Sequence, residues 1–142
     1  SIAGGSTKPE ARLQRVLAWI DANIAKEAVD AFTAVDVLRE RRAECQGHAA
    51  LTAALARALP IPVRRVNGVV YSGQHGGFLY HTWNEAWIEG RGWQAIDATL
   101  GQLSADATHV KLIEGESLAQ LAPLVGMVGK ARVESARALG RW

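Results

Sequence analysis

Two prolines, Pro60 and Pro62, divide the sequence into parts with different hydrophobic periodicity. A proline lacks the N–H that a helix interior requires, so helical structure has to stop at residue 60. Upstream of it, apolar residues recur at steps of three and four, whereas β-branched residues and glycine-containing turns dominate from Val63 onward. Helices that lead and antiparallel strands that follow are typical of an α+β fold, not of alternating α/β units.

The first predicted helix spans residues 10–27 and presents one apolar face to the core. Thr7 and Glu10 are spaced as a capping box, with Thr7 as the N-cap residue. The apolar positions follow helical spacing along the segment: Leu13, Val16, Leu17, Ile20 and Ile24.

Two further helices are predicted before the prolines. One covers residues 34–42, and Thr33 and Asp36 form its capping pair. The other begins near Cys45 and is rich in alanine, with leucines at four-residue steps: Leu51, Leu55 and Leu59. Its small side chains allow close approach of other elements, so we expect it to be the central helix.

Antiparallel strands are predicted after the prolines. The strand-like segments are 63–71, 78–89, 92–99 and 108–113. Three glycines predict a loop over 72–77, and residues 89–92 form a turn between the second and third segments. Residues 117–142 fit neither pattern, because Gly126 and Gly129 interrupt their helix-spaced leucines.

The composition indicates one globular domain. A chain of 142 residues with 49% hydrophobic and 21% charged residues can bury a core without disulfides or a structural metal. The single cysteine cannot form an internal disulfide, which leaves the redox compartment open. A formal charge of +2 with scattered arginines disfavours nucleic acid as a partner. The sequence contains no run of 18 apolar residues that would predict a membrane span.

The start of the sequence predicts a domain from a longer protein. Residues 1–6 (SIAGGS) are typical of a linker or a cut end. We therefore expect residues 1–9 to be a linker, 10–116 to form the core domain and 117–142 to be an extension that packs on the core or leads out of it. As an isolated domain the chain is expected to be monomeric.

Cys45 is placed where a helix should begin, in Ala43–Ala49 (AECQGHA). The unpaired N–H groups and the dipole at a helix N-terminus favour the thiolate over the thiol. The same N–H groups can donate to an oxyanion that develops on an attacked carbonyl. A free cysteine is also among the most buried residue types, so an inert core position is the alternative for Cys45 taken alone.

His81 and Asp97 complete the parts of a thiol nucleophile with an oriented base. Strand alternation puts His81 on one side with Trp83, and the predicted turn places His81 roughly opposite residues 97–98. A one-residue change of register or a bulge decides whether His81 and Asp97 share a face. The alternative is that His81 packs in an aromatic sheet and Asp97 caps a turn.

Residues 38–113 resemble a transglutaminase-like core domain, whose superfamily has a papain-like cysteine proteinase fold. The resemblance rests on motifs in the same order, with a further segment typical of bacterial members: Cys45–Ala49 (CQGHA), Ala56–Pro62 (ARALPIP), Tyr80–Glu85 (YHTWNE), Gly92–Thr99 (GWQAIDAT) and Asp106–Val110 (DATHV). One departure is Ala43, where many members have glycine. The resemblance implies Cys45 as the nucleophile, His81 as the base and acid, and Asp97 as the residue that orients the imidazole.

Four further residues are candidates for the oxyanion site or its lining. Gln46 offers a backbone N–H beside the nucleophile, and His48 lies one helical turn after Cys45. Tyr80 and Trp83 flank His81 and could shield an ion pair from water, although sheet packing would also explain them. No metal site and no cofactor are predicted, because metal-ligand spacing and nucleotide-binding glycine patterns are absent from the sequence.

These observations favour an enzyme that transfers acyl groups from protein or peptide carboxamides, either to water as a peptidase or amidase, or to an amine as a transglutaminase. The alternative is a catalytically silent module of the same fold that binds protein or peptide within a larger chain. The likeness to bacterial members favours the cell envelope or periplasm over the cytoplasm as the location.

Overall fold

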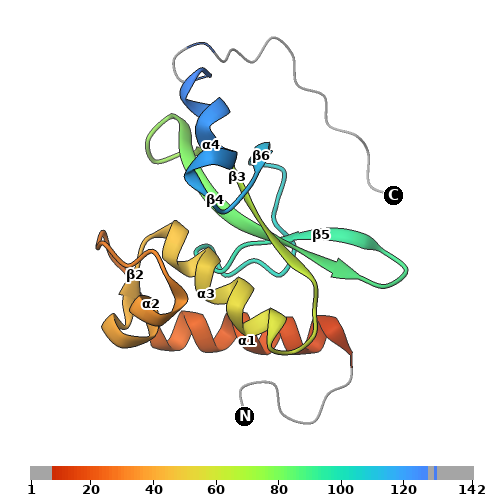
Figure 1. Ribbon diagram of the computed structural model, residues 1–142. Helices are drawn as coiled ribbons and strands as arrows, with labels where there is room; N and C mark the ends of the chain where they lie inside the picture. The colour runs from red at the N-terminus through yellow and green to blue at the C-terminus, as the bar shows by residue number, and fades with distance from the viewer. Residues whose placement is uncertain (1–7, 128–129, 131–142) are drawn as a thin grey trace.

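The computed structural model describes residues 8–127 and 130. Three helices, α1 (Pro9–Asn23), α2 (Ala34–Glu40) and α3 (Cys45–Arg57), precede a four-stranded antiparallel sheet, as Figure 1 shows. Cys45 is the first residue of α3, the central helix. The α+β class and the predicted position of Cys45 at a helix start are therefore confirmed.

Helix α1 is shorter than the predicted 10–27. Its N-cap is Lys8 and not Thr7, which lies outside the described residues. It ends at Asn23, because the following residues form strand β1 (Ala25–Lys26), which pairs in parallel with β2 (Arg42–Ala43). A two-residue strand has no periodic pattern, so this pairing cannot be predicted from local spacing.

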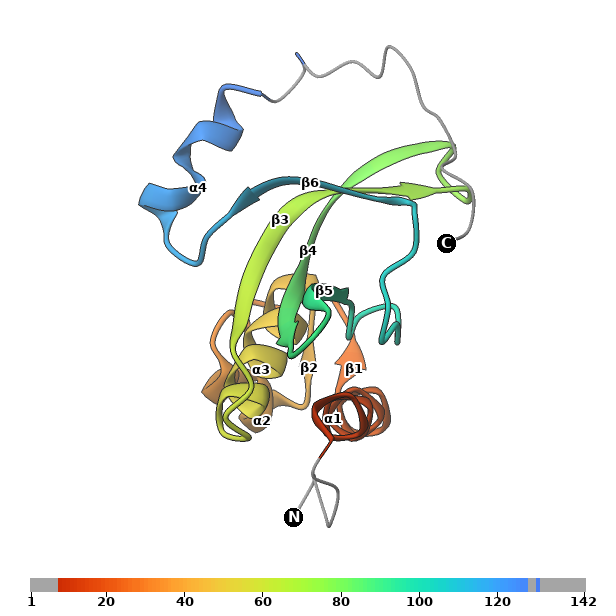
Figure 2. The same cartoon turned by 90° about the vertical axis from the view of Figure 1, so that its right-hand side faces the viewer.

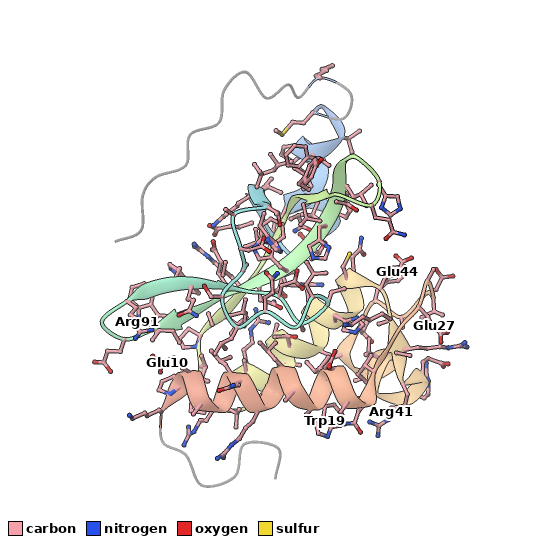
Figure 3. All side chains as sticks on the ribbon, turned by 180° about the vertical axis from the view of Figure 1, so that it is seen from behind. Glu10, Trp19, Glu27, Arg41, Glu44 and Arg91 are labelled. Atoms are coloured by element: carbon pink, nitrogen blue, oxygen red, sulfur yellow. The ribbon has the colours of Figure 1, made fainter. Side chains whose placement is uncertain are left out.

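Two contacts link α1 to later parts of the chain (Figure 3). The Arg41 guanidinium lies 5.5 Å from the centroid of the Trp19 ring. Arg91, in the turn after β4, faces Glu10 with 3.9 Å between the charged atoms. Exposed pairs of this kind contribute at most about 1 kcal/mol, so the helix is held mainly by its buried face.

Helix α2 begins as predicted. Thr33 is its N-cap residue, and the Thr33 hydroxyl accepts the backbone N–H of Asp36 at 3.2 Å. The chain leaves α2 through Arg41, which adopts the left-handed conformation with φ of 57°. This turn directs β2 towards β1 and sets the direction in which the chain enters α3.

The main sheet consists of β3 (Val63–Ser72), β4 (Gly77–Ile88), β5 (Gly92–Ile96) and β6 (His109–Glu114). The strand order is β5-β4-β3-β6, so β6 pairs with β3 and not with the strand that precedes it. The four predicted strands are all present. Figure 2 shows the sheet curving over the helices, and α3 lies between α1 and the sheet.

Two apolar clusters fix α3 in this position. One joins α3 to α1 and the segments around α2: Val16, Leu17, Ile20, Ile24, Ala31, Val37, Ala43, Leu51 and Ala98. The other joins α3 to the sheet: Leu13, Ala53, Ala56, Ile61, Val63, Ala86, Ile88 and Ile96. Helix α3 contributes Leu51 to the first cluster and the alanines Ala53 and Ala56 to the second, so its small side chains face the sheet, as the close approach predicted for a central helix requires.

Strand β5 ends at Ile96, three residues before the predicted end at Thr99. Asp97 leaves the ladder and forms a two-way backbone bridge with Gln102, with N···O distances of 2.8 and 2.7 Å. The chain therefore bends sharply after Ile96, and this bend determines where the Asp97 carboxylate points.

Helix α4 (Leu118–Val125) follows β6 and packs beside it. Ser117 and Gln120 form a capping box at its start, so the ambiguous tail begins with a helix. Residues 128–129 and 131–142 lie outside the described residues, and the division at residues 116 and 117 stays a prediction. Among the described helices, none combines the length and apolar character needed to cross a bilayer.

Candidate active site

The start of α3 presents Cys45 at a partly exposed position. The N-cap residue, Glu44, has extended backbone and makes no side-chain capping hydrogen bond. The first-turn N–H groups of α3 are therefore not occupied by a capping side chain and can donate to an oxygen that approaches Cys45.

Close packing around Gly47 holds this first turn in place. A Cβ on Gly47 would lie 2.6 Å from the Ala43 Cβ, 2.9 Å from the Val37 Cγ2 and closer still to the Ala31 carbonyl oxygen. Only glycine lets α3 begin this near to β2 and the segment before α2. Ala43 itself is buried in β2, so the helix start does not require glycine at that position.

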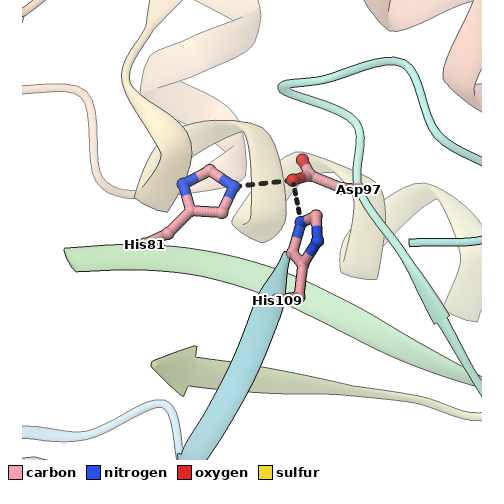
Figure 4. A group of neighbouring side chains, drawn as sticks. All are labelled: His81, Asp97 and His109. Atoms are coloured by element: carbon pink, nitrogen blue, oxygen red, sulfur yellow. Dashed lines mark hydrogen bonds and ion pairs between the residues drawn. The ribbon is translucent and has the colours of Figure 1, made fainter. Parts of the chain in front are cut away.

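His81 and Asp97 lie side by side, as Figure 4 shows, with 2.6 Å between His81 Nε2 and Asp97 Oδ2. Both side chains are buried. The β4–β5 ladder ends at the pair of Asn84 with Ile96, so His81 has no partner on β5 and is not paired with residues 97–98 as the sequence predicts. The chain bends after Ile96, where Asp97 bridges to Gln102, and the Asp97 carboxylate meets His81 from this bend.

The Asp97 carboxylate is fixed at both oxygens. Oδ1 accepts the backbone N–H groups of Thr99 and Leu100, at 2.8 and 3.2 Å. Oδ2 receives His81 and, at 3.0 Å, Nε2 of His109. Burial by itself raises the pKa of Asp97, but the hydrogen bonds from His81 and His109 lower it below the ordinary value, so the carboxyl is ionised at neutral pH.

The pKa of His81 is raised from 6.5 to about 9. Burial by itself lowers this pKa, but hydrogen bonds with Asp97 and Cys45, and the negative charge that each can carry, outweigh it. Because Nε2 faces Asp97, Nδ1 is the ring nitrogen left for the thiol. The arrangement can therefore hold an imidazolium between a carboxylate and a thiolate.

His109 was not among the candidates from sequence. It is the first residue of β6, and its side chain is only 4% exposed. Its ring is 5.8 Å from that of His81 and packs edge-on to Trp83 at 5.1 Å. The only sign in the sequence was its place in the DATHV segment, which carries no information about its distant partner.

The four lining candidates lie in different places. Trp83 is buried and stacks on the His81 ring with 6.1 Å between centroids, which shields that imidazole from water. Tyr80 is half-exposed and donates its hydroxyl to Asn67 Oδ1 at 2.7 Å. His48 is fully buried, and its Nδ1 lies 3.0 Å from the Glu44 carbonyl oxygen. Its side chain therefore lies on the face of α3 that is turned towards the core.

Gln46, next to the nucleophile, lines a cleft of about 440 Å³. Phe32 and Leu121 contribute apolar walls to this cleft, and Arg65 and Asn67 contribute polar groups. A cleft of this size can hold a short stretch of polypeptide or a side chain. Cys45, His81 and Asp97 are not among the residues that line it.

His81, Asp97 and His109 also form a set of possible metal ligands, since their donor atoms all lie within 4.8 Å of one another. In this structure the three groups hydrogen-bond to one another through Asp97 Oδ2. A metal ion would have to displace both hydrogen bonds, so the arrangement is better suited to proton transfer than to coordination.

Comparisons with known proteins show the family to which the chain is similar. The profile of the Transglutaminase-like superfamily matches residues 1–98. The chain is 30% identical over 118 residues to mouse (Mus musculus) kyphoscoliosis peptidase, covering 70% of this chain and 17% of that protein.

Two solved structures are also similar. A candidate cysteine protease from Cytophaga hutchinsonii has a TM-score of 0.64 and 31% identity, covering 78% of this chain and 38% of that one. The periplasmic domain of TgpA from Pseudomonas aeruginosa has a TM-score of 0.54 and 26% identity, covering 68% and 38%. The chain thus spans well under half the length of each of these relatives.

Proposed function

The chain belongs to the transglutaminase-like superfamily, and we propose that it transfers acyl groups from protein or peptide carboxamides through a covalent intermediate on Cys45. One observation carries the proposal. Nε2 of His81 lies 2.6 Å from the buried Asp97 carboxylate, and Cys45, at the start of α3, raises the pKa of the same imidazole together with Asp97.

The chemistry follows from these positions. The Cys45 thiolate attacks the carbonyl carbon, and the N–H groups at the start of α3 stabilise the oxyanion. His81 gives its proton to the leaving amine as the C–N bond breaks, which leaves a thioester on Cys45. His81 then takes a proton from the incoming water or amine, and the thiolate is released.

Water is the acceptor that we propose. The peptidase and the candidate cysteine protease among the relatives support hydrolysis, and the partly exposed position of Cys45 leaves water free to approach. Transfer to a second amine requires that water be kept away from the thioester. The likeness to a periplasmic domain supports a location in the cell envelope.

Incubating the protein with casein and a fluorescent primary amine tests the reaction and the acceptor together. We expect casein fragments or released ammonia without amine label, and no product from the Cys45→Ala variant, which lacks the only thiol in the chain. If casein becomes labelled with the amine, the acceptor is the amine and the reaction is transamidation, not hydrolysis. If wild type and Cys45→Ala give the same products, and Cys45 resists iodoacetamide up to about pH 9, the chain is a silent binding module.

A further inference from the structure

Asp97 is bound from two sides by imidazoles. His81 reaches Oδ2 from β4, and His109 reaches the same oxygen from β6 at 3.0 Å (Figure 4). An ionised carboxylate only accepts hydrogen bonds, so Nε2 of His109 has to be a donor. Oδ1 is already occupied by two backbone N–H groups. The position of Oδ2 is therefore set by His109 as much as by His81.

The other side of His109 is also held. Its Nδ1 lies 3.2 Å from the backbone oxygen of Asp106 and 3.2 Å from Asp106 Oδ1. Asp106 in turn accepts the Thr108 N–H at 2.9 Å and the Gln102 side-chain N–H at 2.8 Å. The Thr108 hydroxyl also donates to Asp106, and this hydrogen bond, with those from the Thr108 N–H and Gln102, lowers the pKa of Asp106 and keeps it a carboxylate.

The segment between β5 and β6 thereby closes on itself. The backbone of Asp97 is bridged to that of Gln102, and the Gln102 side chain donates to Asp106. Asp106 lies next to Nδ1 of His109, and Nε2 of the same ring contacts Asp97. The His109 side chain is 4% exposed, and both of its ring nitrogens lie within hydrogen-bond distance of oxygens of Asp97 or Asp106, which the mere start of a strand does not require. This circuit places a donor at the back of Asp97.

We propose that His109, held by Asp106, is a positioning residue for the acyl-transfer site and keeps Asp97 Oδ2 aimed at His81. This inference rests on the proposed function of Cys45 and His81. His109 does not touch the reacting atoms; it acts through Asp97. Without the His109 donor the carboxylate can turn away from His81, which moves its negative charge farther from the imidazole that it keeps protonated.

The test is the rate at which iodoacetamide alkylates Cys45 at pH 6.5, measured in the full chain. His109→Phe keeps a ring against Trp83 but has no donor, and we expect it to react about tenfold more slowly than wild type. His109→Gln places an amide N–H near the position of Nε2 and should recover most of the rate. His109→Asn reaches only towards Asp106, so it should behave like the Phe variant.

Several results would overturn the proposal. These are a wild-type rate for His109→Phe, equal losses for the Gln and Asn variants, or an undiminished effect of His109→Phe when Asp97 is already Asn. If His109→Phe does not unfold cooperatively, the comparison of Gln with Asn decides alone. His81→Ala separates the two hypotheses. If the His81→Ala variant is alkylated as fast as wild type, the proposed function itself fails. If His81→Ala is alkylated slowly but His109→Phe at the wild-type rate, only the positioning role of His109 is refuted.

Discussion

Replacing Asp97 with Asn should slow acyl transfer by about 10⁴-fold, the loss that the same change causes in a Ser–His–Asp site. Oδ1 of Asp97 already accepts two backbone N–H groups, so the amide nitrogen of Asn cannot take that position. The amide nitrogen must instead take the position of Oδ2, facing His81 and His109. There it donates a hydrogen bond to an imidazole, whereas Oδ2 accepts one. His81 then carries its proton on Nδ1, the nitrogen that has to accept from Cys45.

Initial rates of casein cleavage, with iodoacetamide alkylation of Cys45 beside them, measure this effect. Asp21→Asn is the matched control, because Asp21 is exposed and pairs only with Lys26 at 3.2 Å among the ion pairs of the described residues. We expect the control to keep the wild-type rate. An Asp97→Asn protein that is folded and as fast as wild type would show that Asp97 does not orient His81.

Gly47→Ala should lower the free energy of unfolding by about 3 kcal/mol, at the upper end of the usual cost of overpacking a core. Helix propensity alone predicts the opposite sign, since alanine is favoured over glycine inside a helix by about 1 kcal/mol. The added methyl group would overlap the Ala31 carbonyl oxygen and the Ala43 side chain, neither of which can move without shifting β2 or the segment before α2. The first turn of α3 would be displaced together with Cys45.

Urea unfolding of the two proteins gives the energy, and the Cys45 alkylation rate reports the displacement. Gly73→Ala serves as the control, because a Cβ there would meet nothing within 4 Å and the backbone φ is not positive. We expect this control to unfold like wild type. A stabilised Gly47→Ala protein would mean that α3 does not pack against Ala31 and Ala43 as described.

The fold could be predicted to the extent that hydrophobic periodicity encodes it. The apolar face of α1, the stop at Pro60 and the strands after Val63 all follow from local spacing. The end of α1 could not be predicted, because it depends on the pairing of β1 with β2, two residues each and far apart in the sequence. The early end of β5 similarly depends on the backbone bridge between Asp97 and Gln102.

The candidate site was predictable in its residue types and order, but not in its geometry. The resemblance implies Cys45, His81 and Asp97, whereas the meeting of His81 with Asp97 depends on the bend after Ile96, where Asp97 bridges to Gln102. His109 was missed because β6 pairs with β3, out of sequence order, and only that crossing carries His109 to Asp97. Local pattern contains no information about such a contact.

The titration of the His81 imidazole, followed by NMR from pH 5 to 11, tests the central claim most directly. The folded-state pKa of His81 is about 9, above the ordinary 6.5, so the ring should hold its proton through neutral pH and lose it as the pH rises through about 9. Because Asp97 and Cys45 both raise this pKa, Asp97→Asn and Cys45→Ala should each lower the midpoint. A wild-type midpoint near 6.5 that neither variant changes would contradict the coupling of Cys45, His81 and Asp97.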